Sequence, residues 1–257
     1  MSWKSRVKHV IFIIFLGIFI YSTVMLGYWL IDKTLNNILN KQVVSIYDKS
    51  KIEQRNAAGN EKLIPEEDRR RQVMEPLLKI NGEIVGWLNI ANTRINYPVV
   101  RGKDNEFYLN HNIEKKSSKY GSVFMDYRNR DFAEFAESGK NIIIYGHNMR
   151  DGSMFGDLNL YKKEKFFREN QFINFDILGK QYKWQVFSAY VTNPGFNYIK
   201  TDFKNSIEFN KFLESIRQKS RYTNEVIADA NDIILTLSTC SYEFKDARFV
   251  VHSKLIK

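Results

Sequence analysis

The sequence contains one cysteine, Cys240, at the end of an apolar and β-branched run that begins at Ile233. A short polar turn follows, and a second strand-like run from Ala247 to Val251 carries Arg248. Two strands joined by a short turn pair side by side, so the thiol and the guanidinium can meet across a sheet. A thiol with a fixed cation beside it is the arrangement expected of a nucleophile.

A histidine would complete this chemistry, and the sequence offers four. His147 follows the apolar run NIIIYG and therefore ends a strand, as Cys240 does. His9 lies in a basic flank, and His111 lies in the polar stretch LNHNIEKKSS, which is typical of a surface or turn. His252 closes the last strand, where a structural role is an equal alternative. A thiol, an imidazole and an arginine at the ends of β-runs indicate thiol acyl transfer.

Three short motifs around these residues resemble those of the sortases: TLSTC at 236–240, YGHNM at 145–149 and DAR at 246–248. The eight-residue step from Cys240 to Arg248 resembles the class B sortases in particular, as do GKDNEFYLNHN at 102–112 and GSVFMDYRN at 121–129. The resemblance covers roughly residues 75–257. It implies a mainly β fold, a closed eight-stranded barrel with N-terminal helices and a helix in the connection between strands six and seven.

The resemblance also implies a cysteine transpeptidase. The residues themselves indicate no cofactor. Cys240 would attack a peptide carbonyl and form a thioacyl enzyme, and His147 would carry the proton between the amines. Arg248 would stabilise the oxyanion or hold the substrate backbone, because a guanidinium does not act as a base near neutral pH. The implied partners are surface proteins with an Asn-Pro-x-Thr type of sorting signal and an amine of Gram-positive cell wall peptidoglycan.

By the same resemblance, the groove for the sorting signal would be lined by Asn110, Tyr145, Tyr198 and Ser238. Thr239 flanks the cysteine and could line the same groove. The alternative for Tyr145, Ser238 and Thr239 stays open: these residues could instead have a structural role in the core or in the pairing of the strands. Ser241 stands where several relatives have a longer polar residue, so no substrate contact is assigned to it.

The composition of the 257-residue chain sets broader limits. Its hydrophobic fraction of 44% is sufficient for one sizeable core, and its formal net charge is +10. A basic exterior suits an anionic membrane or polyanionic wall polymers. Nucleic acid is the competing partner, but no basic patch interleaved with aromatic residues supports it. The histidines are scattered, and neither a CxxC motif nor an acidic calcium loop is present, so no metal site is predicted.

The N-terminal region predicts a membrane anchor. Residues 10–31 form an uncharged run long enough to span a bilayer as a helix. Lys4, Arg6 and Lys8 precede the run, which favours a cytoplasmic N-terminus. A cleaved signal peptide is the alternative, but the run is too long for one and no small-x-small cleavage site follows it. The catalytic part would therefore lie outside the cell membrane.

The remaining pattern divides the chain further. We expect a basic flank at 1–9, the anchor at 10–31, a helical stalk with N-terminal helices at 32–80 and the barrel at 81–257. Within the stalk, NAAGN at 56–60 interrupts the helical pattern, and Pro76 would kink or end the helix that begins at Glu66. Short strands follow from Gly86, residues 162–173 have no clear assignment, and residues 206–220 form an amphipathic helix. Many short strands with one late helix favour a closed barrel over a doubly wound sheet.

Two other functions remain open from the residues alone. A papain-like protease or amidase would use water as the acceptor. Such an enzyme usually adds an Asn or Asp that orients the histidine, and its cysteine lies at a helix N-terminus. The other alternative is an anchored binding domain in which Cys240 has no chemical role.

We predict that removing residues 1–31 gives a soluble, active protein, because this segment holds the uncharged run and its basic flank. Membrane fractionation of the full-length and truncated chains measures this. Recovery of the full-length protein in a salt-washed supernatant would count against an integral anchor.

Overall fold

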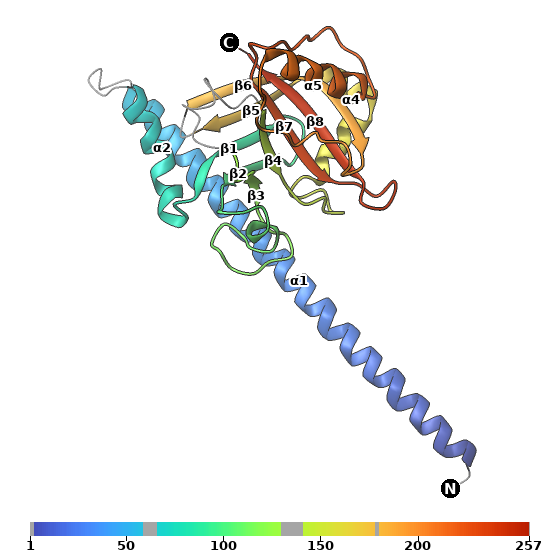
Figure 1. Cartoon of the computed structure of the whole chain (residues 1–257). Coiled ribbons are helices and arrows are strands. Elements are labelled where there is room, and N and C mark those ends of the chain that lie inside the picture. Colours follow the sequence, from blue (N-terminus) through green and yellow to red (C-terminus); the bar gives the residue numbers. More distant parts are fainter. Residues whose placement is uncertain (1–2, 59–65, 130–140, 178–179, 257) are drawn as a thin grey trace. The chain divides into compact units, whose positions relative to one another are not determined.

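The computed structural model describes residues 3–58, 66–129, 141–177 and 180–256 (Figure 1). It divides into two units, Met1–Lys41 and Gln42–Lys257. The first unit is built from helix α1 (Trp3–Ala58), which continues into the second unit. Among the described residues, one helix is long and apolar enough to cross a membrane, and none of its most apolar stretch is buried. This helix is compatible with the predicted single-pass anchor.

Helix α2 (Glu66–Ile80) differs from the expectation in one respect. Pro76 does not end the helix, which continues to Ile80. Met74 and Leu77, on either side of the proline, are buried to 1% and 0% exposure. The burial of such side chains is worth about 1.5–3 kcal/mol each, which offsets the hydrogen bond that a proline cannot donate.

The second unit contains a closed barrel of eight strands in the order β1-β2-β3-β4-β7-β8-β6-β5 (Figure 1). The predicted fold class is therefore confirmed. The strands are β1 (Ile84–Ile90), β2 (Asn96–Val100), β3 (Val123–Met125), β4 (Asn141–Tyr145), β5 (Phe172–Ile177), β6 (Lys180–Thr192), β7 (Ile234–Cys240) and β8 (Arg248–Leu255). Two neighbouring pairs, β2 with β3 and β4 with β7, are parallel, and the other pairs are antiparallel.

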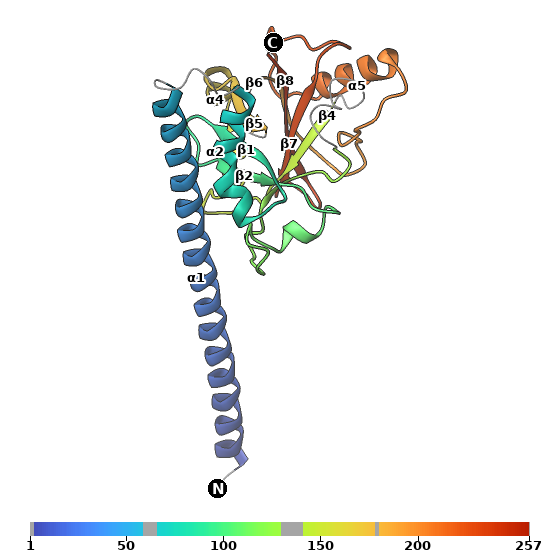
Figure 2. The same cartoon turned by 90° about the vertical axis from the view of Figure 1, so that its left-hand side faces the viewer.

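Short helices connect the strands. They are η1 (Phe107–Leu109), η2 (Gly156–Lys162), α4 (Glu164–Glu169) and α5 (Ser206–Gln218). Helix α5 lies in the connection between β6 and β7, as predicted, and its N-cap Asn205 accepts a hydrogen bond from the backbone N–H of Glu208. Helices α2 and α5 lie on opposite sides of the barrel (Figure 2). The unassigned stretch 162–173 holds the end of η2, helix α4 and the start of β5.

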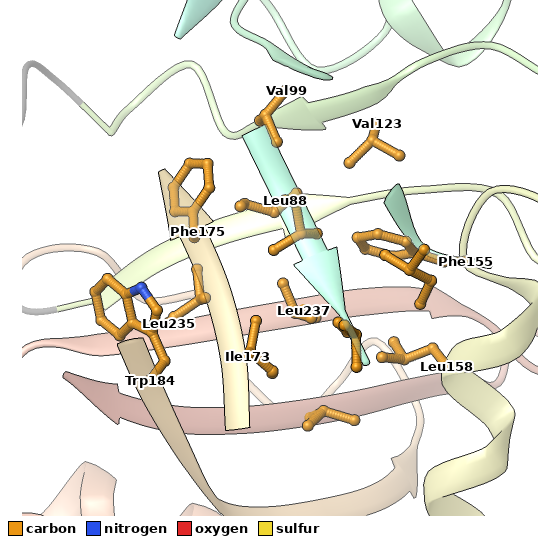
Figure 3. Close-up of a cluster of buried hydrophobic side chains, with 14 of the residues drawn as sticks. Leu88, Val99, Val123, Phe155, Leu158, Ile173, Phe175, Trp184, Leu235 and Leu237 are labelled. Carbon is orange, nitrogen blue, oxygen red and sulfur yellow. The ribbon is translucent and has the colours of Figure 1, made fainter. Parts of the chain in front are cut away.

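Two hydrophobic clusters stabilise this unit. The larger one fills the barrel, where side chains from several strands and from η2 point toward one another (Figure 3). Its labelled members are Leu88, Val99, Val123, Phe155, Leu158, Ile173, Phe175, Trp184, Leu235 and Leu237. The second cluster packs the apolar face of α5 against the outer faces of β6, β7 and β8. Helix α5 therefore covers the strands that lead toward Cys240.

A polar chain runs through the second cluster. Tyr190 donates its hydroxyl proton to His252 Nε2 at 2.8 Å, and Thr236 lies 2.8 Å from His252 Nδ1. The single proton of the Thr236 hydroxyl goes to Asn141 Oδ1 at 2.6 Å, so His252 Nδ1 must be the donor to Thr236. His252 is fully buried. Its role is therefore structural, and it is neutral in this arrangement.

The buried imidazole predicts a pH dependence of stability. Burial lowers the pKa of His252 from 6.5 to about 3. The unfolded chain takes up this proton first, so the stability contributed by neutral His252 is complete above about pH 6.5 and is lost as the pH falls toward 3. Denaturant unfolding at several pH values measures this loss. The variant His252→Gln should flatten the profile in this window. An unaltered slope in His252→Gln would mean that other groups cause the pH dependence.

Candidate active site

Cys240 and Arg248 face each other across two strands. Cys240 is the last residue of β7 and Arg248 the first of β8, and the two are direct partners in the antiparallel register. Such partners have Cβ atoms about 4.5–5.5 Å apart. Arg248 Nη1 donates to the carbonyls of Asp246 at 3.2 Å and Ala247 at 3.1 Å. In the described part of the chain Arg248 has no carboxylate partner, so the guanidinium remains able to bind a negative charge.

His147 reaches the same place by a different route. Strands β4 and β7 run parallel, and Tyr145 is the register partner of Ser238. The pairing continues one residue further, where the backbone N–H of Gly146 donates to the Ser238 carbonyl at 3.3 Å. His147 and Cys240 each lie two residues beyond this register pair, so the parallel pairing brings His147 to the level of Cys240. Both residues are partly buried.

The ring of His147 is oriented by a main-chain carbonyl. His147 Nε2 lies 2.7 Å from the carbonyl oxygen of Leu109, the last residue of η1. A carbonyl oxygen only accepts, so Nε2 carries a proton and Nδ1 is the nitrogen available for proton exchange. Among the described residues, the partner of His147 is this carbonyl and not the orienting Asn or Asp of a papain-like enzyme, and Cys240 lies at a strand end instead of a helix N-terminus. This geometry disfavours the papain-like alternative.

Asn148, which the sequence did not single out, connects the two strand ends. Its side-chain amide donates to the carbonyl of Cys240 at 2.7 Å. Asn159 Nδ2 donates to Asn148 Oδ1 at 2.9 Å, which fixes the orientation of the amide. The hydroxyl of Tyr242 donates to the Asn148 carbonyl at 3.0 Å. The sequence could have pointed to Asn148 only through its place next to His147 in YGHNM. Its hydrogen-bond partners could not be predicted, because they lie elsewhere in the sequence.

The turn after the cysteine is also held. Lys162 Nζ donates to Ser241 Oγ at 2.9 Å and to Glu243 Oε1 at 2.6 Å. The Ser241 hydroxyl donates to the same carboxylate. Burial raises the pKa of Glu243, but the hydrogen bonds from Lys162 and Ser241 outweigh it and leave that pKa below the usual value. The turn therefore carries a charged pair beside the thiol, which no local pattern indicated.

The predicted groove residues lie at the same end of the barrel but differ in exposure. Ser238 and Tyr198 are buried, and their hydroxyl oxygens are 2.9 Å apart. Burial raises the pKa of Tyr198, although the Ser238 hydrogen bond and the Arg248 charge act in the opposite direction, so the phenol is neutral. Asn110 is exposed and directly follows Leu109, the partner of His147. The hydroxyl of Thr239 is used within the strand pair, because it donates to the Gly146 carbonyl at 2.7 Å.

Tyr145 leads to a carboxylate that the sequence did not identify. Its hydroxyl donates to Asp126 Oδ2 at 2.8 Å, and Asp126 is fully buried. Burial by itself raises the pKa of Asp126, but hydrogen bonds from Arg128 and Tyr145 outweigh it, so the pKa lies below its usual value. The carboxylate is therefore charged inside the protein. The segment GSVFMDYRN at 121–129 contains both Asp126 and Arg128, so the sequence could have indicated this ion pair.

The part of the chain that the structure describes brings together no group of three or more His, Cys, Asp or Glu side chains that could hold a metal ion. The side chains described above are a thiol, an imidazole, a guanidinium and several oriented amides and hydroxyls. Such a set can carry out nucleophilic attack, proton transfer and stabilisation of a negative oxygen.

Comparison with known proteins agrees with this chemistry. A family model described as the sortase domain matches residues 88–256. Sortase B of Listeria monocytogenes is 35% identical over 258 residues, which covers 100% of this chain and 99% of the relative. Sortase B of Staphylococcus aureus is 42% identical over 189 residues, which covers 73% of this chain and 76% of the relative.

Solved structures give the same result. Sortase B from B. anthracis in complex with AAEK1 has a TM-score of 0.75 at 39% identity, and the match covers 88% of this chain and 99% of that one. A sortase B–substrate complex from Staphylococcus aureus has a TM-score of 0.75 at 34% identity, with the same coverage. The chain therefore belongs to the class B sortases and is a cysteine transpeptidase of the kind that anchors surface proteins.

Proposed function

We propose that Cys240, His147 and Arg248 are the catalytic residues of this transpeptidase. The observation that carries the proposal is the meeting of three strand ends. Cys240 and Arg248 are direct cross-strand partners, and the parallel pairing of β4 with β7 brings His147 to the same level. No other cysteine is available in the chain to act as the nucleophile.

The reaction would proceed in two steps. Cys240 Sγ attacks the carbonyl carbon of the peptide, and its proton passes to His147 Nδ1. The C–N bond then breaks, the leaving amine takes that proton, and a thioester to Cys240 remains. In the second step an incoming amine attacks the thioester carbonyl and gives its proton to His147. The new amide bond forms as the Cys240 sulfur leaves and is reprotonated.

Arg248 would act on the oxygen that becomes negative in each tetrahedral intermediate. Two observations support this role. Arg248 lies across from Cys240, and among the described residues no carboxylate pairs with its guanidinium. Its contacts to two turn carbonyls would pre-orient the guanidinium, so that little reorganisation is needed during the reaction.

The proposed substrate is a C-terminal sorting signal of the Asn-Pro-x-Thr type. The groove would be formed by Asn110, Tyr145, Tyr198, Ser238 and the backbone beside Thr239. The relative from Staphylococcus aureus that was solved as a substrate complex supports a substrate site on this fold. The proposed acceptor is an amine of cell wall peptidoglycan, and the basic net charge of +10 suits a polyanionic wall.

We also propose a single-pass membrane location. The basic flank at 1–9 would lie in the cytoplasm, residues 10–31 would span the membrane, and residues 32–80 would lead to the extracellular barrel at 81–257. The long apolar helix that begins near the N-terminus supports the span. An extracellular amidase that uses water instead of an amine is the alternative reaction of the same site.

The nucleophile and the histidine can be tested together. With a sorting peptide and an added amine, Cys240→Ala should show no thioacyl adduct by intact mass and no transfer product. Cys240→Ser should be nearly inert, because a hydroxyl is a much weaker nucleophile without a strong base. His147→Ala should lower transfer about a hundredfold or more. The control His111→Ala removes a partly exposed histidine and should leave most activity. Equal losses in both histidine variants would refute this choice of histidine, and a product yield insensitive to the amine would indicate the amidase.

Arg248→Lys separates charge from geometry. Lysine keeps the positive charge but lacks the planar fork that can donate two hydrogen bonds. An oxyanion contact is worth about 2.7–4 kcal/mol, so turnover should fall about a hundredfold or more, with a much smaller change in KM. Steady-state kinetics with the sorting peptide measure both. Near-normal turnover in Arg248→Lys would show that charge alone suffices, and near-normal turnover in Arg248→Ala would remove Arg248 from the mechanism.

A further inference from the structure

The segment between β6 and α5 carries Tyr198, and side chains from the β3–β4 region hold it by its backbone. Asn141 Nδ2 donates to the carbonyl of Tyr198 at 3.2 Å and to that of Lys200 at 2.9 Å. Arg128 Nη2 donates to the intervening carbonyl, that of Ile199, at 3.1 Å. Three consecutive carbonyls of one connecting segment are thus bound by two side chains.

Arg128 is held for this contact by Asp126. Its Nε and Nη2 donate to the two carboxylate oxygens of Asp126 at 2.8 and 2.7 Å, and its own backbone N–H donates to Oδ1 at 3.0 Å. Asn105 and Tyr145 donate to Oδ2 at 3.0 and 2.8 Å. The Asp126 carboxylate is completely buried, while about a third of the Arg128 side chain is exposed. The bidentate pair therefore orients a guanidinium whose second Nη2 hydrogen reaches the Ile199 carbonyl.

Asn141 is oriented from the other side. Its Oδ1 accepts the Thr236 hydroxyl at 2.6 Å, so its amide nitrogen faces the segment. Asn129, three residues after Asp126, donates to the Asn141 carbonyl at 2.9 Å. The Asn129 side chain also accepts from the Ile143 backbone N–H at 2.8 Å. The motif segment GSVFMDYRN thus supplies partners for both donors.

The contacts converge on Tyr198. Its backbone is held by Asn141, and its hydroxyl lies 2.9 Å from Ser238 Oγ, two residues before Cys240. Tyr198 is close enough to Cys240 and Arg248 to interact with both electrostatically. A backbone bound through its carbonyls keeps its place whatever side chains the substrate presents. The bound segment therefore defines where the Tyr198 hydroxyl stands relative to the thiol.

We propose that Arg128 and Asn141 form a carbonyl latch, the set of contacts to the carbonyls of residues 198–200, and that they are positioning residues for transpeptidation. The latch holds Tyr198 against Ser238 beside the reacting sulfur. Its effect on the reaction rests on the proposed function of Cys240, whereas its effect on the segment does not.

Hydrogen exchange tests the latch without any substrate. Arg128→Lys keeps a cation beside the buried Asp126 but gives up the fork that also reaches Ile199. Backbone amides in residues 193–205 should exchange about tenfold faster or more, as expected for the loss of a charged hydrogen bond. Residues 248–255 of β8 should exchange at the parent rate.

Arg168→Lys is the matched control, because Arg168 makes a similar contact to Glu164 through Nε and Nη2. Unchanged exchange in residues 193–205, or a rise that extends to β8, would overturn the local latch.

Kinetics test whether the latch acts through Tyr198. We expect Arg128→Lys to lower kcat/KM for the sorting peptide about tenfold, with Arg168→Lys unchanged. In a Tyr198→Phe background, where the hydroxyl is already absent, Arg128→Lys should cost at most about twofold, because coupled residues are not additive. Fully additive losses would overturn positioning through Tyr198. If the parent enzyme transfers peptide normally and Arg128→Lys does too, the positioning role of the latch is overturned while the proposed function stands. If the parent transfers nothing, the proposed function fails, and the exchange experiment still decides the latch.

Discussion

Two parallel strands that end at the same edge of a closed barrel determine the reactive end of this protein. Strands β4 and β7 pair from Asn141 with Ile234 to Tyr145 with Ser238. Parallel strands point the same way, so the residues that follow them emerge together. The antiparallel return of β8 then brings Arg248 opposite Cys240. A shift of the β4–β7 register by one residue would move His147 to the other face of the sheet and separate it from the thiol.

The same region contains a network of buried polar side chains. His252, Thr236 and Asn141 form a chain in which each donor and acceptor is assigned, and Asp126 is fully buried with Arg128, Asn105 and Tyr145 as partners. Burying a polar group without a partner costs about 1–3 kcal/mol, so these residues specify one arrangement of their neighbours. Their outermost donors bind the segment that bears Tyr198. Stability of the barrel and geometry of the site are therefore supplied by one network.

The orientation of His147 by a main-chain carbonyl has a chemical consequence. The Leu109 carbonyl selects the ring nitrogen that carries a fixed proton without bringing a full negative charge to the site. In the described part of the chain, the partner of the His147 ring is therefore this neutral carbonyl and not a carboxylate. In the proposed two-step acyl transfer, Nδ1 would take a proton from the sulfur and pass it to an amine in turn.

Local patterns in the sequence determined several features of the protein. The strand–turn–strand pattern around Cys240 predicted its pairing with Arg248, because only a short turn separates the partners. The uncharged run at 10–31 and the amphipathic helix at 206–220 were equally local, and the combined motifs predicted the barrel. Only the tertiary structure decided the continuation of α2 past Pro76, the partners of Asn148 and Glu243, the burial of His252 and the binding of residues 198–200 by Arg128 and Asn141. Those contacts join residues far apart in the chain, and strand register and barrel closure bring them together, so no spacing within the sequence encodes them.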